Sequence, residues 1–240
     1  MDFLSQKTSF DTYIGVKSDP NNHEKYLFLR AQKYIQKITW IPGIRMIAVV
    51  NSLSMYATHP DSDIDLFIIT AKNRMWIVRV CITFFFWYYG VWRKGEDIAE
   101  NFCLSFFIEE EESNLSSIAF DDDIYLYFWI YYMKPIYTEW SIYEDFLWAN
   151  TWVDVPFDIR LENMRYLLPL PIIPSSHFFL TRWILTWVNK VFQCIWGWKA
   201  RSQFQKKGSP EGVTITSRML KFHDSDKREE IRDSLDLRDE

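Results

Sequence analysis

Two aspartates separated by a single residue, Asp63 and Asp65, form the pattern in this chain that most directly suggests chemistry. They open an apolar run, residues 66–69, that is typical of a strand. Because side chains along a strand alternate between its faces, both carboxylates point to the same side, about 6–7 Å apart. Mg²⁺ in proteins often takes one or two carboxylates together with the phosphates of a substrate. The pair therefore predicts a magnesium site that serves phosphoryl or nucleotidyl transfer.

The turn ahead of this pair supplies candidate ligands for phosphate. A first apolar run, residues 47–50, ends at Asn51 and Ser52, and a polar loop then leads to the second run. If that loop continues into a short helix, its backbone amides and the hydroxyl groups of Ser52 and Ser54 can meet phosphate oxygens. Ser62, directly before the acids, completes a predicted nucleotide-binding set with these three residues.

An alternation of helices and strands is predicted around these residues. Apolar side chains at three- and four-residue spacing predict a helix over residues 23–37, ahead of the first strand. After the second strand a strongly apolar segment covers residues 75–92, and a third strand is predicted over residues 102–108. The order helix, strand, loop, strand, helix, strand predicts a small α/β unit.

The apolar segment 75–92 has two interpretations. Only Arg79, Thr83 and Gly90 interrupt its bulky side chains, and about 20 apolar residues are needed to cross a bilayer. These three residues fall on one helical stripe, however, and a charge inside a membrane span is costly. A helix buried against a sheet is therefore the favoured interpretation, and a membrane span is the alternative.

Helices are predicted for most of the C-terminal half. The acids at residues 121–123 suit a helix start before residues 124–133. A second helix is predicted over residues 141–152, with Glu144 completing a capping box. Three prolines within residues 167–174 predict an extended linker.

The last long apolar segment, residues 178–198, carries a polar stripe. Its polar residues recur at spacings of four, three, four and four: Arg182, Thr186, Asn189, Gln193 and Gly197. This spacing places them on one face and predicts an amphipathic helix rather than a membrane span. A basic cluster follows, and residues 208–240 are expected to form a polar tail.

Composition and charge limit the classes of protein to which this chain can belong. The chain has 48% apolar residues, which supports a substantial core, and a net charge of −5, which argues against non-specific DNA binding. Three widely spaced cysteines, Cys81, Cys103 and Cys194, indicate reduced thiols and not a metal site built of cysteines. The first twenty residues lack the features of a signal or transit peptide. A cytoplasmic protein is therefore expected, with peripheral membrane association as the alternative.

The acids and the turn also resemble a family motif. Asn51 and Ser52, ten intervening residues and then Asp63-Ile64-Asp65 resemble the signature of the nucleotidyltransferases of the DNA polymerase β superfamily, especially the minimal bacterial type. In that family a Gly-Ser pair ends one strand and an Asp-x-Asp pair begins the next. The resemblance covers mainly residues 30–110. Two later segments, Lys134-Pro135-Ile136-Tyr137 and Ala149-Asn150-Thr151-Trp152, are similar to segments of bacterial proteins that carry this domain with a helical C-terminal half.

The resemblance implies a fold and a reaction. The fold is α/β, with a small mixed sheet and flanking helices over residues 20–112, a helical region over 113–207 and a polar tail over 208–240. Asp63 and Asp65 are the implied catalytic and metal-binding residues. The implied reaction moves a nucleoside monophosphate from an NTP, such as ATP, to a hydroxyl group, with pyrophosphate leaving. The acceptor stays open among small molecules, RNA and protein.

Two positions depart from the family pattern and keep other hypotheses open. Asn51 stands where the family has glycine, and the third strand has Ser105 where a third carboxylate is expected, with Glu109 the nearest acid of the same parity. A nucleotidyltransferase is thus one of three hypotheses. The second is a catalytically weakened protein of this fold that acts as a binding or antitoxin-like module. The third is a membrane-associated protein anchored by residues 75–92 or 178–198.

Overall fold

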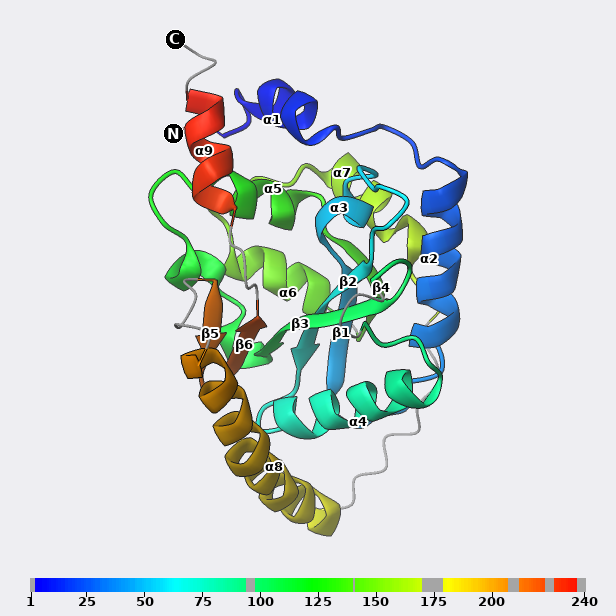
Figure 1. The fold of residues 1–240 in the computed structure, drawn as a ribbon, viewed down its shortest axis with the longest axis vertical. Coiled ribbons are helices and arrows are strands. Elements are labelled where there is room, and N and C mark those ends of the chain that lie inside the picture. The colour runs from blue at the N-terminus through cyan, green and yellow to red at the C-terminus, as the bar shows by residue number, and fades with distance from the viewer. Residues whose placement is uncertain are drawn as a thin grey trace.

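A six-stranded mixed, open sheet forms the centre of the protein, and helices flank both of its faces (Figure 1). The computed structural model describes residues 3–93, 98–139, 141–169, 179–206, 212–222 and 227–236. Its strands are β1 (Ile44–Val49), β2 (Ile64–Thr70), β3 (Phe102–Glu109), β4 (Lys134–Thr138), β5 (Val213–Ile215) and β6 (Met219–Phe222). Their order in the described sheet is β4-β1-β2-β3-β6-β5. In this sheet β2 and β3 run parallel, whereas the other neighbouring strands are antiparallel.

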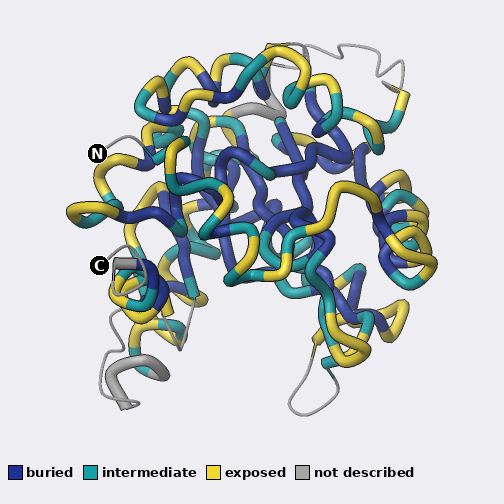
Figure 2. Tube along the Cα trace, turned by 90° about the horizontal axis from the view of Figure 1, so that it is seen from above, coloured by how far each residue is buried: buried dark blue, intermediate teal, exposed yellow. Residues whose placement is uncertain are grey.

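Alternation along the strands divides the core into two layers. Along β1, Ile47 and Val49 pack toward one face, whereas Met46 and Ala48 pack toward the other. The first face is covered by α2 (Asn22–Ile35) and α4 (Met75–Tyr88), and α8 (Phe179–Lys206) packs on α4. The second face is covered by α1 (Lys7–Ile14), α5 (Ile124–Tyr131), α6 (Ile142–Ala149) and α9 (Arg228–Asp236). Buried residues fill the middle of the fold, and exposed residues form its rim (Figure 2).

The remaining helical elements are short. They are α3 (Asn51–Ser54), α7 (Phe157–Asn163) and three 3₁₀ segments, Glu110–Glu112, Leu115–Ile118 and Met164–Tyr166. Of these, α3 follows β1 directly, so the loop after the first strand does continue into a short helix.

The predicted α/β unit is confirmed. The expected helix is α2, which begins with a capping box between Asn21 and Glu24, and the expected strands are β1, β2 and β3. The apolar segment 75–92 contains α4, whose Trp76 and Ile82 are fully buried in the core beneath the sheet. Among the described residues, no helix is both long and apolar enough to cross a membrane. The buried-helix interpretation therefore agrees with the structure for the face of α4 that packs on the sheet, whereas Phe84, Trp87 and Tyr88 are exposed.

Distant side chains satisfy the first amides of α4. Arg74 precedes this helix and provides no side-chain cap, so the orphan N–H groups of the first turn need other partners. The Glu109 carboxylate, at the end of β3, accepts hydrogen bonds from backbone amides that include that of Met75. Asn189 of α8 accepts a hydrogen bond from the Ile77 amide with its side-chain oxygen, at 3.0 Å. The start of α4 is thus tied to both the sheet and α8.

The C-terminal half contributes strands as well as helices, which differs from the expectation. β4 lies within the segment 113–207, expected to be helical, while β5, β6 and α9 lie within the expected polar tail 208–240. Pro135 follows the predicted helix 124–133 as a residue that ends a helix, and the structure places it inside β4. β4 is at the edge of the sheet, where a missing N–H donor is tolerated.

Two details of the predicted helices can be compared with the structure. Asp123 caps α5, because its side chain accepts a hydrogen bond from the Leu126 amide, as the acidic start predicted. The capping box predicted for α6 does not form, since the hydroxyl group of Ser141 donates to Asp145 instead. Most of the predicted proline linker, residues 170–174, lies outside the described residues.

Candidate metal and nucleotide site

The structure brings Asp63 and Asp65 together with a cysteine at the start of β2. Asp63 directly precedes this strand and Asp65 is its second residue. On the parallel neighbour β3, Cys103 is in register with Asp65. Ligand atoms of the two carboxylates and the thiol all lie within 4.8 Å of one another. The predicted pair of acids therefore shares one small cluster with a side chain that the sequence motif does not contain.

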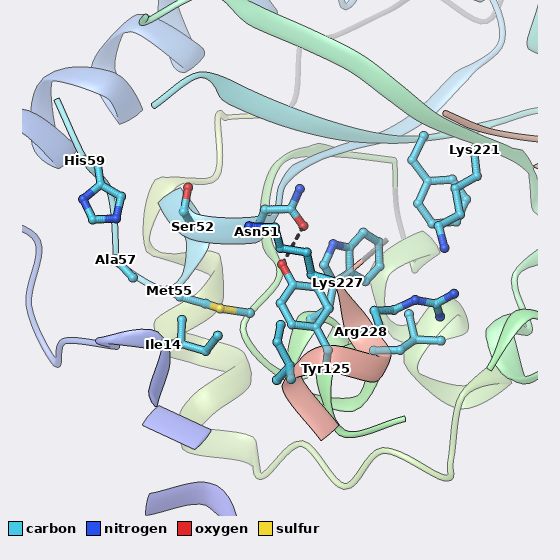
Figure 3. Close-up of a pocket in the computed structure, with 14 residues that line it drawn as sticks. Ile14, Asn51, Ser52, Met55, Ala57, His59, Tyr125, Lys221, Lys227 and Arg228 are labelled. Atoms are coloured by element: carbon cyan, nitrogen blue, oxygen red, sulfur yellow. Dashed lines mark hydrogen bonds between the residues drawn. The ribbon is translucent and has the colours of Figure 1, made fainter. Parts of the chain in front are cut away.

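Asn51 connects this cluster with the turn after β1. Antiparallel pairing places the end of β1 beside the start of β2, and the Val50 amide donates to the backbone oxygen of Asp65 at 3.1 Å. The Asn51 side chain is hydrogen-bonded to the Asp65 carboxyl, and its oxygen accepts from the Tyr125 hydroxyl at 3.3 Å (Figure 3). Asn51 has φ of +57°, a left-handed conformation that glycine adopts freely and asparagine tolerates.

Burial and like charge shape the protonation of the cluster. The Asp65 carboxyl group is enclosed even though the residue as a whole keeps some exposed surface. Burial and the neighbouring Asp63 charge raise the pKa of Asp65 to about 6, against the opposing effects of Asn51, Cys103 and Arg93. Burial, together with the same two carboxylates, also raises the pKa of Cys103. At neutral pH the thiol is therefore protonated, whereas Asp65 is ionised.

A cation of the chain itself occupies one side of the cluster. The guanidinium Nη1 of Arg93 lies 2.7 Å from the Asp63 carboxylate and 3.7 Å from the Cys103 sulfur. The Arg93 amide is held by the Phe102 carbonyl, next to a bridge between Trp92 and Phe102. Sequence reasoning missed Arg93 because this residue lies 30 positions after Asp63. Arg93 reaches the cluster because the segment around Trp92 pairs with Phe102 at the start of β3.

The predicted phosphate ligands divide by position. Ser52 is one of the residues that line a cavity beside the turn (Figure 3). Ser54 is buried, and its hydroxyl group donates to the Asn51 carbonyl at 2.8 Å. Ser62 closes its own turn by accepting a hydrogen bond from the His59 amide at 2.9 Å. Of the three serines, Ser52 is thus the one that the structure places against open space.

The expected third position requires a correction. An irregularity in pairing follows Asp65, because β3 advances three residues to Phe106 while β2 advances two to Phe67. This shift puts Cys103, and not Ser105, in register with Asp65. Glu109 pairs with Thr70, five residues beyond Asp65 and hence about 17 Å along the strand. Glu109 therefore belongs to the start of α4 and not to the acid cluster.

A cavity of about 390 Å³ opens beside Asn51. Its volume falls within the range of small-molecule sites. Three elements supply most of its wall: the turn after β1, helix α5 and the start of α9. Its lining includes Asn51, Ser52, His59, Tyr125, Trp129, Lys221, Lys227 and Arg228 (Figure 3). Arg228 also forms an ion pair with Asp123 at 2.6 Å, which fixes the position of this charge. The cavity combines aromatic walls, a polar turn and a basic end.

Comparisons with known proteins identify no family for this arrangement. The chain matches no protein-family model, no curated protein and no solved structure.

Proposed function

We propose that the protein is a magnesium-dependent nucleotidyltransferase of the DNA polymerase β superfamily type. The observation that carries this proposal is the bridge formed by Asn51, which touches the Asp65 carboxyl on one side and lines the cavity on the other. A nucleotide in the cavity would therefore have its phosphates between the turn and the acids. The parallel pair of β2 and β3 beside an antiparallel β1 supports the same type of fold.

The residues of the cluster fit a magnesium ion through oxygen only. Asp63 and Asp65 offer the carboxylates that Mg²⁺ prefers, whereas the protonated sulfur of Cys103 is a poor ligand for a hard cation. When bound, the ion would neutralise the phosphate charge that develops during transfer. Asn51 holds the Asp65 carboxyl in place for this task. Arg93 neutralises Asp63 in the absence of a ligand and has to yield part of that carboxylate.

The cavity supports a division of roles in the proposed reaction. Ser52 and the amides of the turn face the triphosphate, and the aromatic walls formed by Tyr125 and Trp129 suit a base or an apolar acceptor. The hydroxyl oxygen of the acceptor attacks the α-phosphorus and loses its proton to solvent, the bond from the α-phosphorus to the pyrophosphate oxygen breaks, and the nucleoside monophosphate is transferred. The acceptor class stays open among small molecules, RNA and protein.

A second candidate function is a catalytically weakened protein of the same fold that binds nucleotides without transferring them. The specific observation in its favour is the cluster itself, where Cys103 stands beside Asp65 and Arg93 is paired with Asp63. A third carboxylate next to the pair would strengthen metal binding or activate the acceptor hydroxyl. A neutral thiol does neither. Binding with little turnover is the outcome that this candidate predicts.

Calorimetric titration separates the outcomes. Mg-ATP or Mg-CTP is titrated into the wild type, into Asp65→Asn and into Asp61→Asn, whose carboxylate is exposed on the preceding loop. We expect metal-dependent binding that is lost in Asp65→Asn and kept in Asp61→Asn. Absence of metal-dependent binding in the wild type would overturn both candidates. If the wild type binds, pyrophosphate release is measured in the wild type and in Cys103→Asp. A negligible release by the wild type that rises in Cys103→Asp favours the catalytically weakened protein.

A further inference from the structure

Helix α8 packs with its polar stripe toward the protein. Asn189 is only 2% exposed and accepts the Ile77 hydrogen bond at 3.0 Å. Thr186 accepts a hydrogen bond from the Arg74 guanidinium at 2.9 Å. Gly197, on the same stripe, lies against the ring of Trp76. These polar residues thus contact α4 and its start, and Leu185, Val188 and Phe192 pack against the core beside them. In Figure 1 α8 lies below α4 at the lower edge of the fold.

The opposite side of α8 is apolar and faces outward. Trp183, Trp187 and Trp198 are 76%, 68% and 71% exposed. Their spacings of four and eleven residues place them on one helical stripe, and Ile184 and Ile195 are exposed beside it. A helix on the surface of a globular protein usually turns its large apolar side chains to the core and polar ones to water, whereas these five apolar side chains face outward. The outer face of α8 therefore has the composition of a surface that becomes covered.

Charge indicates what covers it. The segment of α8 contains five basic residues and no acidic residue, although the chain as a whole has a net charge of −5. Lys190 and Arg201 are exposed on the side of the tryptophan stripe, whereas the exposed Lys199 lies about 180° around the helix from Lys190. Tryptophan and cations on one helical face are typical of helices that lie in the plane of a membrane interface.

We propose that the outer face of α8 docks the protein on an anionic lipid bilayer. The three tryptophans enter the boundary between headgroups and acyl chains, while Lys190 and Arg201 contact lipid phosphate or carboxylate groups. The helix lies on the bilayer and does not span it. This inference is independent of the proposed nucleotidyl transfer, because α8 packs outside α4, and the acid cluster lies at the start of β2.

A lipid surface suits this face better than a second copy of the chain. A symmetric dimer built on α8 would place the same patch of each copy against the other. Lys190 and Arg201 would then face the basic face of the other copy without an acidic residue of α8 to pair with. Anionic lipid supplies the opposite charge and an apolar phase together.

Co-sedimentation of the full chain with vesicles tests the proposal. We expect binding to vesicles of phosphatidylcholine mixed with phosphatidylserine, and weaker binding to phosphatidylcholine alone. The double substitution Trp183→Ala and Trp187→Ala should reduce binding about tenfold or more, because both rings lose their insertion. Lys190→Glu should reduce binding to the anionic vesicles at least about fivefold, since one cation near the surface is lost.

Matched controls make the outcome specific. Trp148 of α6 is 73% exposed on the other side of the sheet, so Trp148→Ala removes an equally accessible ring without touching α8. Lys25→Glu reverses an exposed charge on α2. Both controls should bind vesicles as the wild type does, and circular dichroism should show that every variant is folded.

Three results would overturn the proposal. The first is absence of binding to either kind of vesicle. The second is equal loss of binding in Trp148→Ala and in the double tryptophan variant. The third is light scattering that shows a dimer of the wild type which the double tryptophan variant abolishes, because the face would then be covered by a second copy.

Discussion

Replacing Asn51 by alanine and by glycine separates the two roles of this residue. Its backbone has φ of +57°, and its side chain is hydrogen-bonded to Asp65 and Tyr125. Both substitutions remove the side-chain bonds, but glycine alone keeps the left-handed backbone free of strain. The difference in the free energy of unfolding between the two variants therefore measures the backbone strain. The loss that both variants share relative to the wild type measures the side-chain hydrogen bonds.

The structure gives magnitudes for both effects. A bond to an ionised carboxylate contributes about 1.5–3 kcal/mol, so either variant should have a free energy of unfolding lower than the wild type by about this amount. Alanine adds strain of about 1–2 kcal/mol at a left-handed φ. Glycine has a freer unfolded chain, which costs about 0.4–1 kcal/mol relative to alanine. The strain exceeds this entropy term, so Asn51→Gly should be the more stable variant by about 0.5–1 kcal/mol.

Urea unfolding at pH 8, where Asp65 is ionised, measures these differences. The midpoints should follow the order wild type, Asn51→Gly, Asn51→Ala, with equal slopes for the three proteins. An alanine variant as stable as the glycine variant, or more stable, would refute the left-handed turn. Both variants as stable as the wild type would refute the hydrogen bond between Asn51 and Asp65.

Three further predictions concern protonation, the seating of α8 and the core. Burial lowers the pKa of Lys134 to about 8 from an ordinary 10.5. Between pH 8 and pH 10.5 this lysine therefore binds more protons in the unfolded chain than in the folded one, and its contribution to the free energy of unfolding rises with pH. Between pH 8 and 10 the free energy of unfolding of the wild type should gain on that of Lys134→Met by up to about 1.4 kcal/mol per pH unit in urea titrations, and a constant difference would contradict this. Asn189→Leu leaves the buried Ile77 amide without its acceptor and should cost about 1–3 kcal/mol by urea unfolding, whereas Trp187→Ala should change stability by less than about 0.5 kcal/mol. Phe67→Ala opens a cavity between Phe106 and Trp129 and should cost about 3–5 kcal/mol, and a smaller loss would show that the site collapses.

The sequence predicted the part of the fold that rests on local pattern. Continuous apolar runs identified β1, β2 and β3, and the long bulky segment identified α4 as a helix. β4 was missed because Pro135 ends a helix in local reasoning, whereas its place at the edge of a sheet is a tertiary property. The short strand β6 was missed because it pairs with β3, more than a hundred residues earlier, and β5 was missed with it because β5 pairs with β6.

The part of the candidate site that depends on local pattern was also predictable. Alternation along one strand was enough to place Asp63 and Asp65 on one side. The third position depends on the irregular register between β2 and β3, so sequence parity led to Ser105 while pairing places Cys103 there. Arg93 enters the cluster only through the path of the chain after α4. Periodicity likewise identified a polar stripe on α8 but not the fact that this stripe faces inward.

Binding of Mn²⁺, followed by electron paramagnetic resonance, tests the central claim most directly. Mn²⁺ prefers the same oxygen ligands as Mg²⁺ and reports its own coordination. We predict that the wild type binds Mn²⁺, more tightly with ATP present, and that Asp63→Asn and Asp65→Asn each weaken binding by about tenfold or more. Asp61→Asn, on the exposed loop before the cluster, should bind as the wild type does. Equal binding by the wild type and Asp65→Asn, or no binding by the wild type, would contradict a metal site at the start of β2.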